Sequence, residues 1–387
     1  MRRYIEILRL PGILRVTASQ LLARLPLGMI ALATLLHVEH SVGSYAVAGV
    51  TVACVSVGEA VAAPILSRLV GVTGVPLTLM VAAVANAASL VLLSAVPLEG
   101  ATPFLIGLLV GVSVPPVMPA IRAVYPRLVP RDKVGSLFAL DTTAQELIWV
   151  GGPILAVLLS SSLSTAFALW VAAGITLVGT AWFVTTPKLA DVTIPRATEA
   201  AGRVLRYRSV QIAMVSSGAL VASFTALELG VVARFDGDEA IAGLLLAASA
   251  LGSLIGGLLL GHRRFRLREI VGALAIVAAG TALAGVDRGV GLLLVALFIS
   301  GFGFAPALAA LYYMVSNEVD EKSSTEAFGW LNTAALFGGA AGAAIAGVVS
   351  ESLGVPGAFL VAVLLATSAT VSPAIARVRG PLPGLAH

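Results

Sequence analysis

The sequence predicts an all-α membrane protein whose twelve transmembrane helices form two six-helix repeats. Hydrophobic residues make up 58% of the 387 residues and charged residues only 11%, against about 25% charged residues in typical soluble domains. Apolar runs long enough to cross ~30 Å of hydrocarbon recur along the whole chain. Because these runs are continuous rather than alternating, they predict helices and exclude a β-barrel.

Twelve spans place both chain ends on the same side of the membrane. All but three of the 24 Lys and Arg residues fall at the chain ends or in the loops on that side. Because positively charged loops stay in the cytoplasm, both termini are predicted to be cytoplasmic. The same asymmetry accounts for the pI of 9.5 and argues against a nucleic-acid partner. The expected spans are 13–37, 43–70, 76–97, 102–124, 138–160, 163–185, 209–232, 238–261, 268–286, 289–315, 324–349 and 354–376.

A long polar segment, residues 187–208, is the predicted cytoplasmic linker between a six-helix bundle at 1–186 and a second at 209–387. Within it, Thr198 to Arg208 is either an interfacial helix or a polar tether. A shift of 190 positions aligns "GVSVPPVMPAIRAVYPRLV" with "GFGFAPALAALYYMVSNEV" without a gap. The fourth and fifth helices therefore repeat as the tenth and eleventh. Parallel repeats of this kind are typical of transporters, which bind their substrate near the midplane between the repeats.

Several local patterns resemble the major facilitator superfamily, across essentially the whole chain. "APILSRLVGVTG" resembles the family's loop motif after the second helix; it keeps Arg68 but has Gly71 where an aspartate is usual. "ELIWVGGPILA", which contains Gly152 and Pro153, resembles the fifth-helix motif of drug exporters that work by proton antiport. The resemblance implies a central cavity between the repeats, a monomer, and the inner (plasma) membrane of a bacterium.

Three ionisable residues of the first half are expected inside the membrane, where charges are costly and usually functional. At 1.5 Å per residue, Arg24 and Glu59 lie at similar depth, roughly 16 Å from the inner helix ends, and Glu146 lies roughly 12 Å deep. An arginine that exchanges carboxylate partners predicts a proton switch, because pairing alters proton affinity. The alternatives are an Arg24–Glu59 salt bridge that only joins two helices, and Glu146 alone as the proton site.

Other charged residues lie nearer the helix ends. Glu228, in the outer third of the seventh helix, is a candidate for binding a proton or a cationic substrate; alternatively, it lies at the headgroup level without a role. By the family resemblance, Arg122, Asp141 and Glu326 imply intracellular gate bridges between the halves. His37 and the neighbouring outer loop offer too few ligands for a metal site.

The expected substrate follows from the helices that line the cavity in the resembling family. In this chain these helices are mostly apolar, which favours hydrophobic or weakly cationic small molecules. Alternatively, the aromatic side chains on these helices do not line a cavity and only pack between helices. The candidate cavity residues are Gln20, Phe224, Phe304, Gln145, Trp330 and Asn332.

The sequence therefore predicts a proton-coupled exporter that works by alternating access, with a small-molecule substrate, protons and membrane lipid as its partners. The alternatives are proton-coupled uptake or efflux of a small metabolite or sugar, movement of lipids, a transport-inactive membrane scaffold, and an integral-membrane enzyme. No phosphate-binding loop, catalytic constellation or metal motif stands out. An enzyme, an ATP-driven pump and a bound cofactor are therefore not expected, and an ion gradient must supply the energy.

Overall fold

The computed structural model describes residues 2–187, 202–235, 238–260, 267–286 and 289–378, and the regular elements in these ranges are helices. Twelve helical segments of this part are long and apolar enough to cross a membrane, which confirms the predicted number of spans. The first half contains α1 (Arg2–Leu8), α2 (Ile13–Val42), α3 (Tyr45–Thr73), α4 (Val75–Ala95), α5 (Thr102–Val112), α6 (Val117–Leu128), α7 (Arg131–Ser162) and α8 (Thr165–Val184). The second half contains α10 (Arg208–Arg234), α11 (Glu239–Leu260), α12 (Leu267–Ala284), α13 (Val290–Glu318), α14 (Glu321–Leu353) and α15 (Val355–Val378).

The predicted linker is only partly described. Residues 188–201 lie outside the described residues, and with them the start of the segment from Thr198 to Arg208. The described remainder contains a short 3-10 helix, η1 (Arg203–Arg206), directly before α10. Residues 261–266, between α11 and α12, also lie outside the described residues.

The fourth membrane crossing consists of two helices, α5 and α6, rather than one continuous helix. The break falls at Pro115 and Pro116, which have no N–H to donate, and a residue that precedes a proline avoids the helical conformation. At the repeat-related positions, Ala305 and Pro306, α13 runs unbroken through the second half. One proline is thus accommodated within this helix, whereas two in succession end it.

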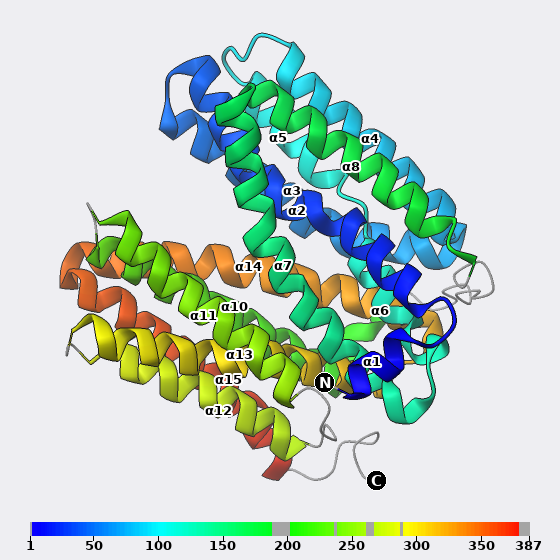
Figure 1. The fold of residues 1–387 in the computed structure, drawn as a ribbon, viewed down its shortest axis with the longest axis vertical. Helices are drawn as coiled ribbons and strands as arrows, with labels where there is room; N and C mark the ends of the chain where they lie inside the picture. The colour runs from blue at the N-terminus through cyan, green and yellow to red at the C-terminus, as the bar shows by residue number, and fades with distance from the viewer. Residues whose placement is uncertain (1, 188–201, 236–237, 261–266, 287–288, 379–387) are drawn as a thin grey trace.

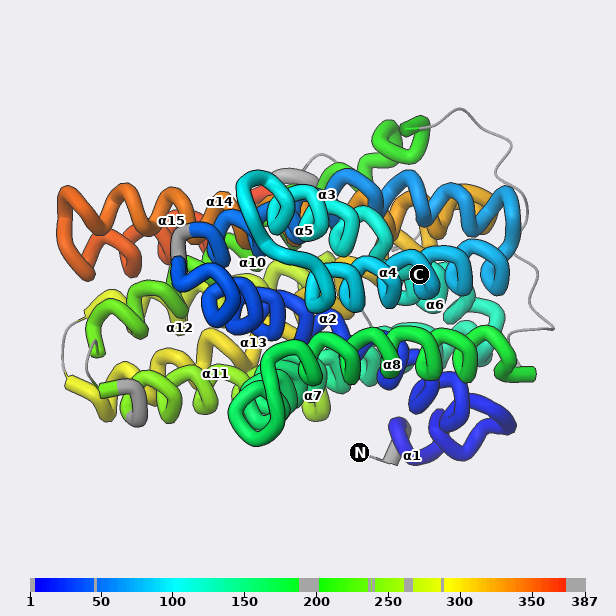
Figure 2. The backbone as a smooth tube through the Cα atoms, turned by 90° about the horizontal axis from the view of Figure 1, so that it is seen from above, coloured from blue at the N-terminus to red at the C-terminus, as the bar shows by residue number. Residues whose placement is uncertain are grey.

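The two six-helix groups approach each other on the side that holds α1 and the end of α15, and they diverge toward the other side (Figure 1). We call the first of these the terminal side. The seam between the groups is formed by α3, α6 and α7 against α11, α13 and α14. Figure 2 shows the same arrangement after a turn of 90°, with α3 close to α14. Both halves therefore take part in any site that lies on this seam.

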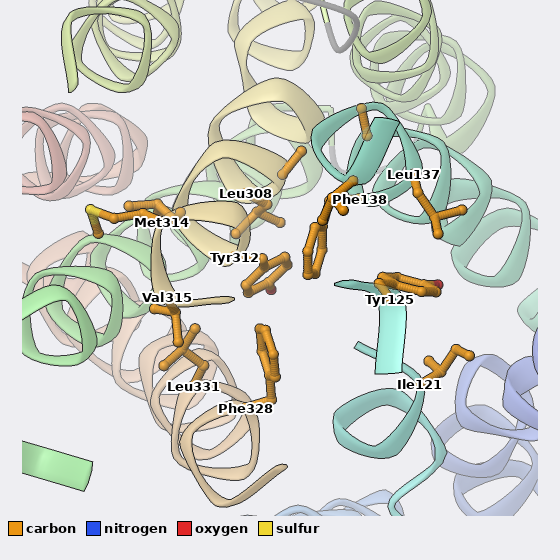
Figure 3. Packing of buried hydrophobic residues seen from close by; sticks show 14 of the residues in the cluster. Ile121, Tyr125, Leu137, Phe138, Leu308, Tyr312, Met314, Val315, Phe328 and Leu331 are labelled. Carbon is orange, nitrogen blue, oxygen red and sulfur yellow. The ribbon is translucent and has the colours of Figure 1, made fainter. Parts of the chain in front are cut away.

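An aromatic layer closes the seam on the terminal side (Figure 3). The ring of Phe138 on α7 meets Tyr125 of α6 at 5.1 Å and Phe328 of α14 at 5.9 Å between centroids. Phe328 in turn lies 6.2 Å from Tyr312 of α13. All four side chains are buried. Because rings from both halves interlock here, the terminal side is closed in this structure.

Candidate functional site

A cluster of five polar side chains, four of them buried and Gln145 half-buried, lies within the first half, between α2, α6 and α7. We call it the arginine cluster; at its centre, Asp141 accepts from Arg24 at 2.6 Å and from Arg122 at 2.9 Å. The side chains of all three have at most 2% exposure. Two glutamines complete the cluster. The side-chain oxygen of Gln20 accepts from Arg24 at 2.7 Å, and the side-chain oxygen of Gln145 accepts from both Arg24 and Arg122.

The cluster corrects the partner that depth alone predicted for Arg24. Arg24 pairs with Asp141 and not with Glu59 or Glu146. Equal depth on neighbouring helices was misleading because the rotation of each helix also decides which side chains meet. One signal was available in the sequence: Gln20 and Arg24 are four residues apart, as are Asp141 and Gln145, so each pair shares a helix face.

The cluster also revises the roles expected for Asp141 and Gln20, while Arg122 keeps a contact with the other half. Asp141 forms its ion pairs inside the first half, so it does not bridge the halves as the family resemblance implied. Arg122 does reach the second half, because its guanidinium lies 3.9 Å from the ring centroid of Tyr312. Gln20 is 1% exposed and bonded within the cluster, so it does not line a cavity in this structure.

Glu59, on α3, faces the second half. Its Oε1 accepts a hydrogen bond from Nδ2 of Asn332 on α14 at 3.3 Å. One residue further along each helix, the Thr333 hydroxyl donates to the carbonyl oxygen of Ala60 at 2.7 Å. Two hydrogen bonds therefore cross the seam at the middle of α3, and Glu59 and Asn332, expected for different roles, lie together.

Glu146, midway along the 32-residue α7, also bonds across the seam. The hydroxyl of Ser253 on α11 donates to its Oε1 at 2.8 Å. The carboxyl of Glu228 on α10 is near enough for Glu146 to interact with it electrostatically. Two of the predicted acids, one from each half, thus interact electrostatically. The sequence singled out both acids, but Ser253 carried no signal because lone serines are common in apolar helices.

The predicted cavity aromatics are all half-buried. Phe224 of α10 and Phe304 of α13 are half-buried, and their ring centroids are 4.8 Å apart. Because Phe224 and Glu228 are four residues apart, they share one face of α10. Trp330 is also half-buried, and it packs against the same hydrophobic core as Phe304.

An ion pair joins the halves at the terminal side. Nη1 of Arg68 donates to Oε2 of Glu326 at 3.2 Å, and the backbone N–H of Gly202 donates to the other carboxylate oxygen at 2.7 Å. The Tyr4 hydroxyl of α1 donates to the carbonyl oxygen of Gly257 on α11 at 2.6 Å. Burial raises the pKa of Tyr4, so this hydroxyl remains a donor at physiological pH.

Gly152 and Pro153 lie inside α7, which continues through them. A Cβ on Gly152 would lie 2.6 Å from the Cα of Gly28 on α2. No side chain fits in that space, so the glycine allows α2 and α7 to pack backbone to backbone. This contact holds α7, and with it Glu146, close to the helix that carries Arg24.

Comparisons with known proteins agree with this architecture. Residues 16–229 and 209–384 match the sequence model of the Major Facilitator Superfamily. A search of curated proteins gives no significant match. Among solved structures, the chain is similar to the human organic anion transporter TETRAN, with 16% identity, a TM-score of 0.74, and coverage of 94% of this chain and 99% of that one.

Two bacterial structures are similar to the same degree. For the fucose:proton symporter of Escherichia coli, the identity is 13%, the TM-score 0.76, and the coverage 95% of this chain and 98% of that one. For a bacterial homologue of the iron transporter ferroportin in an outward-facing state, the identity is 16% and the TM-score 0.72. The match covers 94% of this chain and 99% of that one. At these identities the likeness concerns the fold, not the substrate.

Proposed function

The chain belongs to the major facilitator superfamily and is a secondary transporter of small molecules, and we propose that it exports hydrophobic or weakly cationic molecules in exchange for protons. With the termini in the cytoplasm, as the charge asymmetry predicts, closure of the terminal side makes this the outward-facing state. Alternating access then requires the seam on the terminal side to part while the opposite side closes. Contacts across the seam are therefore those that change during transport.

The hydrogen bond between Glu146 and Ser253 is the observation that carries the proposal for proton coupling. Acceptor and donor belong to different halves, so the bond breaks when α7 and α11 separate. A carboxyl group whose hydrogen bonding differs between two states binds protons unequally in them. By linkage, proton binding then shifts the balance between the two states. Glu228, on the other half, is the natural second member of this proton site.

The proposed substrate class rests on the groups beside these acids. Phe224 lies one helical turn from Glu228 on α10, and its half-buried ring packs at a tilt against the half-buried ring of Phe304 on α13. Aromatic faces next to an isolated acid suit a hydrophobic molecule that carries a weak positive charge. The arginine cluster holds α2, α6 and α7 together within the first half. In our proposal it stays fixed during transport, and Arg24 itself does not carry the proton.

Transport in everted membrane vesicles tests this proposal. The vesicle lumen is acidified, and luminal pH is followed with a quenching dye while lipophilic cations and neutral drugs are added. We expect substrate to release luminal protons with the wild type and at least tenfold more slowly with Glu146→Gln, which keeps the shape of the side chain but cannot ionise. Glu99→Gln removes an exposed carboxylate from the loop after α4 and should behave as wild type.

Each outcome has a distinct meaning. If Glu146→Gln releases protons at the wild-type rate, Glu146 carries no proton and Glu228→Gln becomes the decisive variant. If no substrate releases protons from wild-type vesicles, the proposal of proton-coupled export is wrong. Uptake of metabolites and sugars into right-side-out vesicles would then test import.

A further inference from the structure

A small cavity lies where the broken fourth crossing meets α3 and α14. Its volume is about 20 Å³, enough for a single water molecule or ion. Its polar side chains are those of Glu59 and Asn332, and the residues of the helix break, from Val114 to Pro116, form another wall. The cavity is therefore lined by a carboxylate, an amide and an unwound backbone.

The helix break leaves backbone oxygens without donors. Because Pro116 has no N–H, the carbonyl oxygen of Val112 has no helical partner. The N–H of Val117 turns to the carbonyl of Pro115 at 2.8 Å. As a result, within the described chain, the carbonyl oxygens of Ser113 and Val114 also receive no backbone hydrogen bond. The break thus leaves unpaired carbonyls, which carry a partial negative charge, and one of them belongs to Val114, a residue that lines the cavity.

Two glycines bring α3 against this break. A Cβ on Gly58 would lie 2.7 Å from the carbonyl oxygen of Leu108, and a Cβ on Gly111 would lie 2.9 Å from the backbone nitrogen of Glu59. The two backbones therefore touch at these points. Because Glu59 follows Gly58 directly, the contact fixes the carboxyl group beside the end of α5.

We propose that this cavity binds one Na⁺ ion. Carboxylate, amide and carbonyl oxygens are the ligands that hard cations prefer, and unwound carbonyls at the end of a half-helix serve this purpose in secondary transporters. A single carboxylate balances a single positive charge. No Lys, Arg or His is among the described residues that line the cavity, so the incoming cation meets no repulsion.

The position of the cavity on the seam couples the ion to conformation. Glu59 belongs to the first half and Asn332 to the second, and their hydrogen bond exists because the terminal side is closed. When α14 moves away from α3, the Asn332 amide moves with it, and the cavity loses one of its two polar side chains. A ligand that binds one state better than the other shifts the protein toward that state, so Na⁺ favours the closed terminal side.

Binding of radioactive sodium to the purified full-length protein in lipid nanodiscs tests the inference without requiring transport. We expect saturable binding to the wild type, at least tenfold weaker binding to Glu59→Gln, and severalfold weaker binding to Asn332→Leu. The exposed carboxylate Glu99 provides the matched control, and Glu99→Gln should bind as wild type. Na⁺ should also raise the melting temperature of the wild type but not of Glu59→Gln, whereas choline at the same ionic strength should have no effect.

Two results overturn the inference: no saturable sodium binding by the wild type, or equal binding by the wild type and a well-folded Glu59→Gln. Proton release on titration without sodium binding would mean that Glu59 takes a proton instead. The outcome is separate from that of the proposed function, because Glu146→Gln should abolish proton exchange and still bind sodium.

Discussion

Asp141 is the residue on which the first half depends most. It is the one carboxylate between the two buried guanidinium groups of Arg24 and Arg122. Removing the carboxylate leaves both charges in a low-dielectric interior without an ionic partner, which costs far more than the loss of an exposed ion pair. The cluster is therefore a stability element whose failure affects α2, α6 and α7 together.

Asp141→Asn should lower the free energy of unfolding by about 3–5 kcal/mol, the usual cost of breaking a buried pair from one side. Thermal unfolding in detergent, followed by tryptophan fluorescence, measures the change. Asp132→Asn is the matched control, because Asp132 lies exposed in the first turn of the same helix. Equal melting temperatures for the two variants would contradict a structural role for the cluster.

Individual side chains were also the least predictable feature of the molecule. The sequence marked Arg24, Glu59 and Glu146 correctly as ionisable groups within apolar helices. It did not reveal their partners, because those depend on helix rotation and on which half each neighbour belongs to. The sequence did not show that Asn332 of α14 would bind the carboxyl group of Glu59, or that Ser253 of α11 would bind that of Glu146.

At the scale of elements, small residues decide how closely helices pack. Gly111 and Gly301 occupy the same position in the two repeats, and each brings its helix against a neighbour, α3 in the first half and α11 in the second. Small residues let helix backbones approach closely, but the sequence does not show which helix each glycine meets. It also showed the double proline in the fourth crossing, yet the apolar run alone predicted one uninterrupted helix.

Gly111→Ala should lower the free energy of unfolding by about 1–3 kcal/mol, because a methyl group there overlaps the backbone of α3. Gly301→Ala should have a similar effect in the second half, where the methyl group would meet the Cα of Ser249 at 3.0 Å. Gly174→Ala and Gly272→Ala are the controls within the same halves, since a Cβ at either position meets nothing within 4 Å. Similar melting temperatures for all four variants would show that the helices can move apart at these contacts without loss of stability.

At the scale of the whole molecule, the two repeats build one seam with two matching crossings. On one side α3 meets α14, with Glu59 against Asn332; on the other α7 meets α11, with Glu146 against Ser253. The sequence predicted the repeats and the number of spans because apolar runs and a gapless shift are one-dimensional signals. It could not predict that an acid would mark each crossing, since crossings arise only when the halves are docked.

The conformational balance of the whole molecule should respond to Glu326, whose ion pair with Arg68 joins the halves. In a Cys54→Ser background, Ser67→Cys places a thiol at a fully buried position on the terminal side, against Gly329 of the other half. Labelling by a membrane-impermeant maleimide in everted vesicles then reports how often the seam opens. Glu326→Gln should increase the labelling rate about fivefold, equivalent to ~1 kcal/mol, because the amide keeps no charge for Arg68.

Glu351→Gln, at the exposed far end of the same helix, should leave the rate unchanged. If both variants label at the parental rate, the ion pair does not hold the terminal side closed, and the aromatic layer and the other contacts across the seam must do so.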